Sequence, residues 1–171
     1  MPFAVQRPDV DERVVAGEPP RERAERLALA KATAVAGKHP RSVIIGADQV
    51  ASCGESILDK PGNAQVARAQ LVAQSGRRVL FHSAVAIVDT ARGTEECFTD
   101  LTTVVMRTLG GAEIDAYIAS DQPFDCAGSL RSEKLGISLC ERIESEDPTG
   151  LVGLPLIRLC ACLRACGYAL P

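Results

Sequence analysis

A short apolar run at residues 42–47 constrains the fold more than any other stretch of the chain. It consists of β-branched and small residues, a composition typical of a strand that is buried on both faces. The run ends in an acid and an amide, Asp48 and Gln49. In open α/β sheets, ligands collect at the carboxyl ends of such strands. We therefore expect a buried strand that presents Asp48 to a ligand site.

Lys60 supports this interpretation, because it follows Asp48 by only twelve positions, after a turn at Gly54 and before Pro61 and Gly62. A carboxylate at the end of a buried strand needs a partner, since burying an unpaired charge is expensive. The alternative is that Asp48 caps a local turn, which is the commoner role of an aspartate that follows a strand.

The length of 171 residues predicts one domain, residues 1–171, with a substantial core. The net charge of −3 provides no basic field, so a nucleic acid polymer is not expected as a partner. No apolar run has the length of a membrane span, and the N-terminal residues do not resemble a signal peptide. The sequence therefore predicts a cytoplasmic protein without a membrane partner.

Seven cysteines raise the question of a metal site. On a helix, Cys160 and Cys162 would point about 200° apart, so they cannot bind one zinc ion together. The chain has no Cys-x-x-Cys, and its only histidines, His39 and His82, stand alone. The odd number also argues against a disulfide framework. We predict that the cysteines are small buried apolar residues, and a cysteine-based metal-binding module is the disfavoured alternative.

Periodicity and turn residues predict the order of the remaining elements. Helices are expected at residues 21–36, 63–74, 111–120 and 154–166, and strands at 77–89, 95–109 and 136–143. The link at residues 91–94 joins the two long strands into an antiparallel hairpin. These elements predict an α/β fold, with a twisted mixed β-sheet flanked by helices and one long antiparallel hairpin.

Two charged features lie N-terminal to the apolar run. Lys31 lies in the middle of an apolar helical stripe, so it either extends to the nearest edge or points towards the crevice of Asp48. Asp9, Asp11 and Glu12 form an acidic cluster. A solvated turn is its ordinary explanation, and a divalent cation held by one or two of the carboxylates is the functional one.

Six short motifs together resemble the Maf family of nucleotide pyrophosphatases, in order and spacing along nearly the whole chain. They are Asp11-Glu12, Ala30-Lys31-Ala32, Gly46-Ala47-Asp48-Gln49-Val50, Lys60-Pro61-Gly62, Cys126-Ala127-Gly128-Ser129 and Gly153-Leu154-Pro155-Leu156. Asp48-Gln49, the stretch from Ser129 to Glu133, and Asp147-Pro148-Thr149 are most similar to the subgroup that hydrolyses 7-methyl-GTP. The resemblance implies a Maf/inosine triphosphatase-like fold.

The resemblance also implies an activity, namely hydrolysis of a nucleoside triphosphate between its α and β phosphates. Asp48 matches the acid–base residue, and Glu12 and Asp48 match the ligands of a divalent metal cation, Mg²⁺ or Mn²⁺. Lys31 and Lys60 match the residues that meet the phosphates. These roles agree with the positive charge, the metal and the water-orienting carboxylate that polyphosphate hydrolysis needs. A homodimer is implied as well.

Gln49 and Glu133 match the positions that set base preference in the family. A carboxylate suits 7-methylguanine, because the methylated ring is cationic and its Watson–Crick edge presents N–H donors. Without the resemblance, Glu133 would be interpreted as a surface charge in a polar loop.

The chain departs from the family pattern at its N-terminus, where it begins after the expected strand and Ser-x-Ser-Pro-x-Arg loop. The resemblance therefore describes a domain that is N-terminally truncated relative to the family, with fewer phosphate contacts and weaker catalysis. The alternative function is a catalytically weak homologue that binds nucleotides or regulates septum formation.

Overall fold

One antiparallel sheet of five strands, in the order β2-β1-β3-β4-β5, organises the molecule. The computed structural model describes residues 2–171. The strands are β1 (Val43–Cys53), β2 (Ser56–Leu58), β3 (Arg78–Asp89), β4 (Thr94–Met106) and β5 (Cys140–Glu144). The α-helices are α1 (Pro20–Ala36), α2 (Ala64–Gln74), α3 (Gly111–Asp121) and α4 (Leu156–Ala165), and three 3₁₀ helices are η1 (Ala127–Ser129), η2 (Leu135–Leu139) and η3 (Gly150–Val152).

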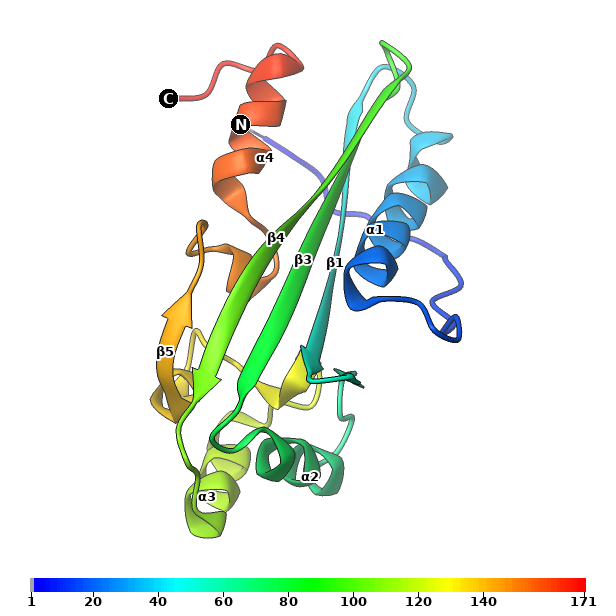
Figure 1. The fold of residues 1–171 in the computed structure, drawn as a ribbon. Coiled ribbons are helices and arrows are strands. Elements are labelled where there is room, and N and C mark those ends of the chain that lie inside the picture. Colours follow the sequence, from blue (N-terminus) through cyan, green and yellow to red (C-terminus); the bar gives the residue numbers. More distant parts are fainter. Residues whose placement is uncertain (1) are drawn as a thin grey trace.

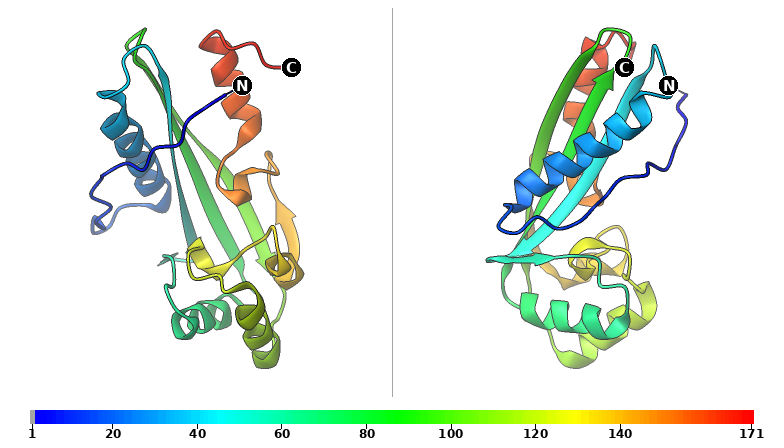
Figure 2. Two further views of the ribbon diagram at one scale, coloured as in Figure 1. Left: turned by 180° about the vertical axis from the view of Figure 1, so that it is seen from behind. Right: turned by 90° about the vertical axis from the view of Figure 1, so that its right-hand side faces the viewer.

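The helices form layers around the sheet. Helices α1 and α4 cover opposite faces of its upper part, while α2 and α3 lie together at its lower end (Figure 1 and Figure 2). The face under α4 packs Leu159 and Leu163 against Val85 and Ile87. The lower end has the largest apolar cluster, formed by α2, α3 and the ends of the strands. Within residues 2–171, no helix is both long and apolar enough to cross a membrane.

Helix α1 packs unusually closely on β1 because the contact contains only very small residues. Ala24, Ala28 and Ala32 repeat every four positions, so they form one stripe along the helix, and all three are fully buried. Gly46 of β1 faces this stripe, and a Cβ atom there would collide with the carbonyl oxygen of Ala28 and the backbone nitrogen of Ala32. The backbones therefore approach each other at the position of Gly46.

The predicted fold class is confirmed, including the helices on the sheet and the long β3–β4 hairpin, which pairs Arg78 with Val105 at one end and Asp89 with Thr94 at the other. The expected mixture of strand directions is not observed, because all strand pairs among the described residues are antiparallel. A parallel pair needs a connection that returns to the same end of the sheet. Here α2 stays at the lower end, so β3 starts where β1 finishes (Figure 1).

The first strand differs from its prediction in length and burial. It does not end before Asp48 but continues to Cys53, so Asp48 and Gln49 lie within β1. Pairing with β3 extends from Val43 to Ser52, and these backbone hydrogen bonds carry the strand through the polar pair. The segment is not buried on both faces either, since Ile45 is 39% exposed.

The strand predicted at residues 136–143 is wrong in its first half. Residues from Leu135 to Leu139 form η2, and β5 begins only at Cys140. A Cβ atom at Gly136 would collide with the carbonyl group of Arg131, so the chain turns tightly against the preceding loop at this point. The Ser138 hydroxyl closes the turn by donating to the carbonyl oxygen of Leu135.

Gly46→Ala should destabilise the protein, because the added methyl group meets backbone atoms of α1 that cannot move aside alone. We expect the free energy of unfolding to fall by about 2–3 kcal/mol, as in overpacked cores. Gly37→Ala is the matched control, since Gly37 has helical φ and no atom near the new methyl group. Urea unfolding of both variants measures the difference, and equal stability of the two would contradict the close α1–β1 contact.

Candidate active site

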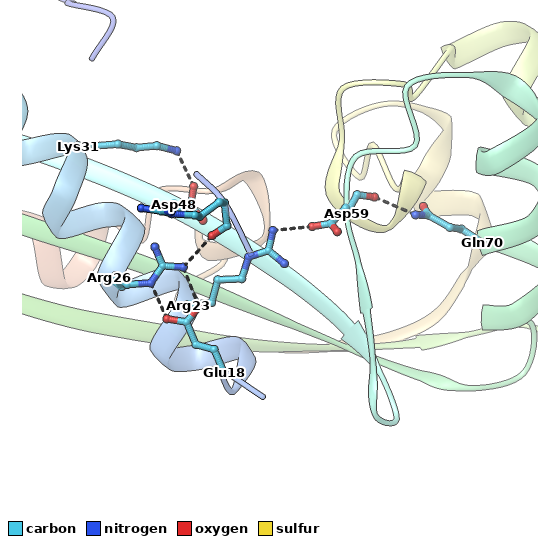
Figure 3. A network of polar contacts seen from close by, with 8 residues as sticks. Glu18, Arg23, Arg26, Lys31, Asp48, Asp59 and Gln70 are labelled. Atoms are coloured by element: carbon cyan, nitrogen blue, oxygen red, sulfur yellow. Dashed lines mark hydrogen bonds and ion pairs between the residues drawn. The ribbon is translucent and has the colours of Figure 1, made fainter. Parts of the chain in front are cut away.

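Asp48 lies on the face of β1 that α1 covers, where it forms an ion pair with Lys31. The Nζ atom of Lys31 donates to Oδ1 of Asp48 at 2.6 Å and lies 3.0 Å from Oε1 of Glu12 (Figure 3 shows Lys31 and Asp48). The side chains of Lys31 and Asp48 are only 19% and 13% exposed, whereas that of Glu12 is 54% exposed. The structure therefore brings three of the predicted catalytic residues together, partly shielded from solvent.

The environment of this cluster makes Asp48 a stronger base than an ordinary aspartate. Burial raises the pKa of Asp48, the nearby Glu12 carboxylate raises it further, and the Lys31 ammonium counteracts only part of the rise. Burial alone would lower the pKa of Lys31, but hydrogen bonds to Asp48 and Glu12 outweigh it, so the pKa of Lys31 is raised. Lys31 is thus cationic near neutral pH.

Two arginines of α1 extend this polar cluster, and the sequence analysis missed both (Figure 3). Arg26 binds both carboxylate oxygens of Glu18, with its Nε and Nη2 atoms at 2.5 and 2.7 Å. Arg23 donates from Nη2 to Oδ1 of Asp59 at 2.9 Å. A signal for Arg23 exists in the sequence, because it precedes Lys31 by eight residues and so lies on the same side of the helix.

Lys60 forms no hydrogen bond or ion pair with Asp48, Lys31 or Glu12 in the described part of the chain. Its side chain is exposed and makes no ion pair with any residue of the described part of the chain. The preceding residue, Asp59, binds Arg23 of α1, as Figure 3 shows. The segment that carries Lys60 is therefore connected to the helix that carries Lys31.

Gln49 points to the other face of the sheet, as expected for neighbours in a strand. Its Nε2 atom donates to Oγ of Ser83 at 2.8 Å and to the carbonyl oxygens of Gly150 and Leu151 at 3.2 and 3.0 Å. Gln49 therefore holds η3 by hydrogen bonds to its backbone, while Asp48 faces α1 on the other side of the sheet. The two residues that the resemblance assigned to catalysis and base preference have separate environments.

Glu133 is exposed and lines a cavity of about 350 Å³ on the side of η3. The other residues around this cavity are mostly apolar or small and polar: Ser132, Ile137, Ile143, Ser145, Pro148, Leu151 and Val152. Leu151 is also a hydrogen-bond partner of Gln49. The η3 segment thus connects the two predicted specificity residues, although their side chains do not touch.

A larger hollow of about 530 Å³ lies between the end of α3 and the loop at residues 122–134. None of the predicted site residues lines it. Its arginine, Arg131, is already paired with Asp125 at 2.5 Å. The cavity of Glu133 is smaller but carries an exposed carboxylate beside apolar walls, which suits an aromatic base with N–H donors better.

Glu12 and Asp48 fit a divalent cation, because both carboxylates already converge on the single ammonium group of Lys31. Mg²⁺ is commonly held by one or two carboxylates, with water and substrate phosphates completing its coordination. Residues 2–171 contain no group of three or more His, Cys, Asp or Glu side chains that could hold a metal ion.

The cysteines form no metal site among the described residues, and all seven are free thiols. Cys53 and Cys162 are buried, as predicted. Cys97 is exposed, so the prediction of a buried residue is wrong there, and the remaining four are only partly buried: Cys126, Cys140, Cys160 and Cys166. Cys97 lies on β4 opposite Ala86 of β3, on the face of the sheet that α1 covers.

Comparison with known proteins identifies the family of the chain. The sequence model of the family described as Maf-like protein matches residues 1–166. The chain belongs to the Maf family. Its relatives include proteins named 7-methyl-GTP pyrophosphatase from Polaromonas sp., Albidiferax ferrireducens and Xanthomonas oryzae pv. oryzae.

These Maf relatives are similar along the whole chain. The Polaromonas protein is 51% identical over 170 residues, which cover 99% of this chain and 78% of the relative. The Albidiferax protein is 48% identical over 98% of this chain and 84% of its own length. The Xanthomonas protein is 49% identical over 99% of this chain and 88% of its own length. The resemblance to the Maf family is thereby confirmed.

Lys31→Met should raise the pKa of Asp48 further, because the ammonium group is the largest influence that lowers it. Carbon-13 NMR titration of the Asp48 carboxyl group, in protein kept free of divalent metal, measures this change. Lys38→Met is the control, since Lys38 is an exposed lysine just beyond α1. A pKa of Asp48 that is the same in both variants would contradict the Lys31–Asp48 contact.

Proposed function

We propose that this Maf protein hydrolyses 7-methyl-GTP to 7-methyl-GMP and pyrophosphate. The observation that carries the proposal is the cluster of Asp48, Lys31 and Glu12, in which a largely buried base of raised pKa lies beside a cation and a second carboxylate. The names of the relatives from Polaromonas and Albidiferax support the choice of substrate.

In the proposed reaction, Asp48 accepts a proton from the water molecule that attacks the α-phosphorus atom. The new P–O bond forms as the bond between the α-phosphorus and the bridging oxygen breaks, and pyrophosphate leaves with the bonding electron pair. The raised pKa of Asp48 favours this role, because a general base works best when its pKa is closer to the operating pH.

Lys31 and Lys60 are proposed to bind phosphate oxygens, since a triphosphate carries several negative charges into the site. Lys31 is held beside Asp48, and Lys60 projects from the segment that Arg23 anchors. Glu12 and Asp48 would hold Mg²⁺ or Mn²⁺, which when bound would neutralise phosphate charge and polarise the reacting P–O bonds.

The base of the substrate is proposed to lie in the cavity lined by Glu133. Its carboxylate would accept hydrogen bonds from the cationic 7-methylguanine ring, and apolar side chains such as Ile137 and Val152 would contact the ring faces. Gln49 would contribute by holding η3, which forms one wall of this cavity.

Three further predictions also belong to this proposal. A homodimer, a cytoplasmic location and a single domain at residues 1–171 stay predictions. Size-exclusion chromatography with light scattering would test the first.

Purified protein should release pyrophosphate from 7-methyl-GTP faster than from UTP or dTTP in the presence of Mg²⁺ or Mn²⁺. Asp48→Asn should lower kcat by about 10²–10⁴-fold, the usual contribution of a general base. Asp115→Asn is the control, because Asp115 is an exposed aspartate of α3 away from the site. Binding of nucleotide without pyrophosphate release would support the regulatory alternative instead, and full activity of Asp48→Asn would contradict the proposed base.

Glu133→Gln should reduce the preference for 7-methyl-GTP over UTP, because it removes the charge that favours the cationic ring. The ratio of the two kcat/KM values should fall by a factor that corresponds to about 1.5–3 kcal/mol, the contribution of one hydrogen bond to a charged group. Gln49→Thr should lower the same ratio by displacing η3. Glu141→Gln, an exposed change on β5, is the control. Ratios that stay at the wild-type value in both site variants would place base recognition elsewhere.

A further inference from the structure

We infer that the Arg23–Asp59 ion pair is a positioning device that holds Lys60 towards the phosphates of the substrate. The inference rests on the proposed function, which assigns Lys60 to phosphate binding. It adds two residues, Arg23 and Asp59, that act through Lys60 and do not themselves touch the substrate.

The ion pair connects two separate parts of the molecule. Arg23 belongs to α1, whereas Asp59 lies in the connection between β2 and α2, and Figure 3 shows the two side chains facing each other. Arg23 Nη2 lies 2.9 Å from Asp59 Oδ1. The Arg23 side chain is only 11% exposed, so its position is fixed by packing, while the Asp59 side chain is 61% exposed. The buried arginine therefore determines where Asp59 lies.

A second contact holds the backbone of Asp59. Gln70 of α2 donates from Nε2 to the carbonyl oxygen of Asp59 at 2.8 Å (Figure 3). The other end of the same amide, Oε1 of Gln70, accepts a hydrogen bond from Ser129 at 2.5 Å. Ser129 is fully buried and belongs to the motif at residues 126–129, for which the reaction itself provides no role. This motif thus supports the residue immediately before Lys60.

The chain is also anchored directly after Lys60. Pro61 is buried, and the backbone N–H of Gly62 donates to the carbonyl oxygen of Phe124 at 2.9 Å. Gly62 has φ +69°, a conformation that other residues adopt only with strain. The backbone on both sides of Lys60 is therefore fixed, whereas the lysine side chain itself is exposed.

This arrangement reduces the freedom of a side chain that is otherwise very flexible. A lysine loses about 2 kcal/mol of rotamer entropy when it is fully ordered, so a fixed Cα position makes phosphate binding less costly. Small misplacements of a binding group away from the reacting atoms reduce rates considerably. Among residues 2–171, Arg23–Asp59 is the ion pair that connects α1 to the β2–α2 segment, so its loss should free Lys60 to shift relative to α1 and Lys31, although Gln70 and Phe124 still hold the neighbouring backbone.

The direction in which Asp59→Asn changes nucleotide binding separates a positioning role from a purely electrostatic effect of the lost charge. Asp59→Asn removes a negative charge beside a polyphosphate site and frees Arg23, and each of these changes alone should strengthen nucleotide binding. A positioning role predicts the opposite, namely weaker binding, because Lys60 is no longer held in place.

The test is a double-mutant cycle of Asp59→Asn and Lys60→Ala, measured by calorimetry with the α,β-methylene analogue of 7-methyl-GTP and by kcat/KM for 7-methyl-GTP. We expect Asp59→Asn to weaken binding about three- to fivefold in the wild-type background, the range of a partly exposed ion pair. In the Lys60→Ala background its effect should fall below about twofold, because coupled residues are not additive.

Asp115→Asn is the matched control, since Asp115 forms a similar Arg–Asp pair with Arg68 at 2.7 Å, away from the site, and it should leave binding unchanged. Equal effects of Asp59→Asn in both backgrounds, or tighter binding, would overturn the inference. If Lys60→Ala weakens binding while Asp59→Asn does not, only the positioning role is wrong. If the wild-type protein does not bind the analogue at all, the proposed function fails as well.

Discussion

The contact between α1 and β1 is the constraint on which the site depends. Because Gly46 lets the backbone of the strand approach Ala28 and Ala32, no bulky side chain separates helix from sheet. Lys31 lies beside Ala32 and Asp48 lies two residues beyond Gly46, so their side chains meet at 2.6 Å. The burial of a carboxylate in the middle of a strand is thus compensated by a cation from the helix. Small apolar residues that carry no chemistry determine the geometry of the charged ones.

The two faces of β1 have different tasks in the proposed enzyme. Asp48 and Gln49 are neighbours in sequence, but strand geometry directs one to α1 and the other to η3. Chemistry on the phosphates and recognition of the base are therefore supported by separate sets of contacts. A substitution at Gln49 should therefore leave the Lys31–Asp48 pair in place.

The polar contacts between α1 and the lower part of the molecule matter more for orientation than for stability. An ion pair with one largely exposed partner, such as Arg23–Asp59, contributes about 1 kcal/mol or less to folding. Its proposed role is to orient the segment that carries Lys60, because Arg23 is packed in α1 and Asp59 immediately precedes Lys60. Gln70 and Ser129 add hydrogen bonds that connect the same point to the buried motif at residues 126–129. The position of Lys60 is thereby connected to α1, to α2 and to the motif at residues 126–129.

The sequence by itself determined the helices, the long hairpin and the family, since helical periodicity, turn residues and motif spacing are local signals. It also identified Glu12, Lys31 and Asp48, which the structure brings together. Only the tertiary structure decided that β1 continues past Asp48, because that depends on hydrogen bonds to β3, more than thirty residues away. The Arg23–Asp59 pair and the contact from Gln49 to η3 were likewise beyond sequence reasoning. Such contacts join segments that are far apart in the sequence. They form only when the elements pack, so no local sequence pattern indicates which side chains will come within hydrogen-bond distance.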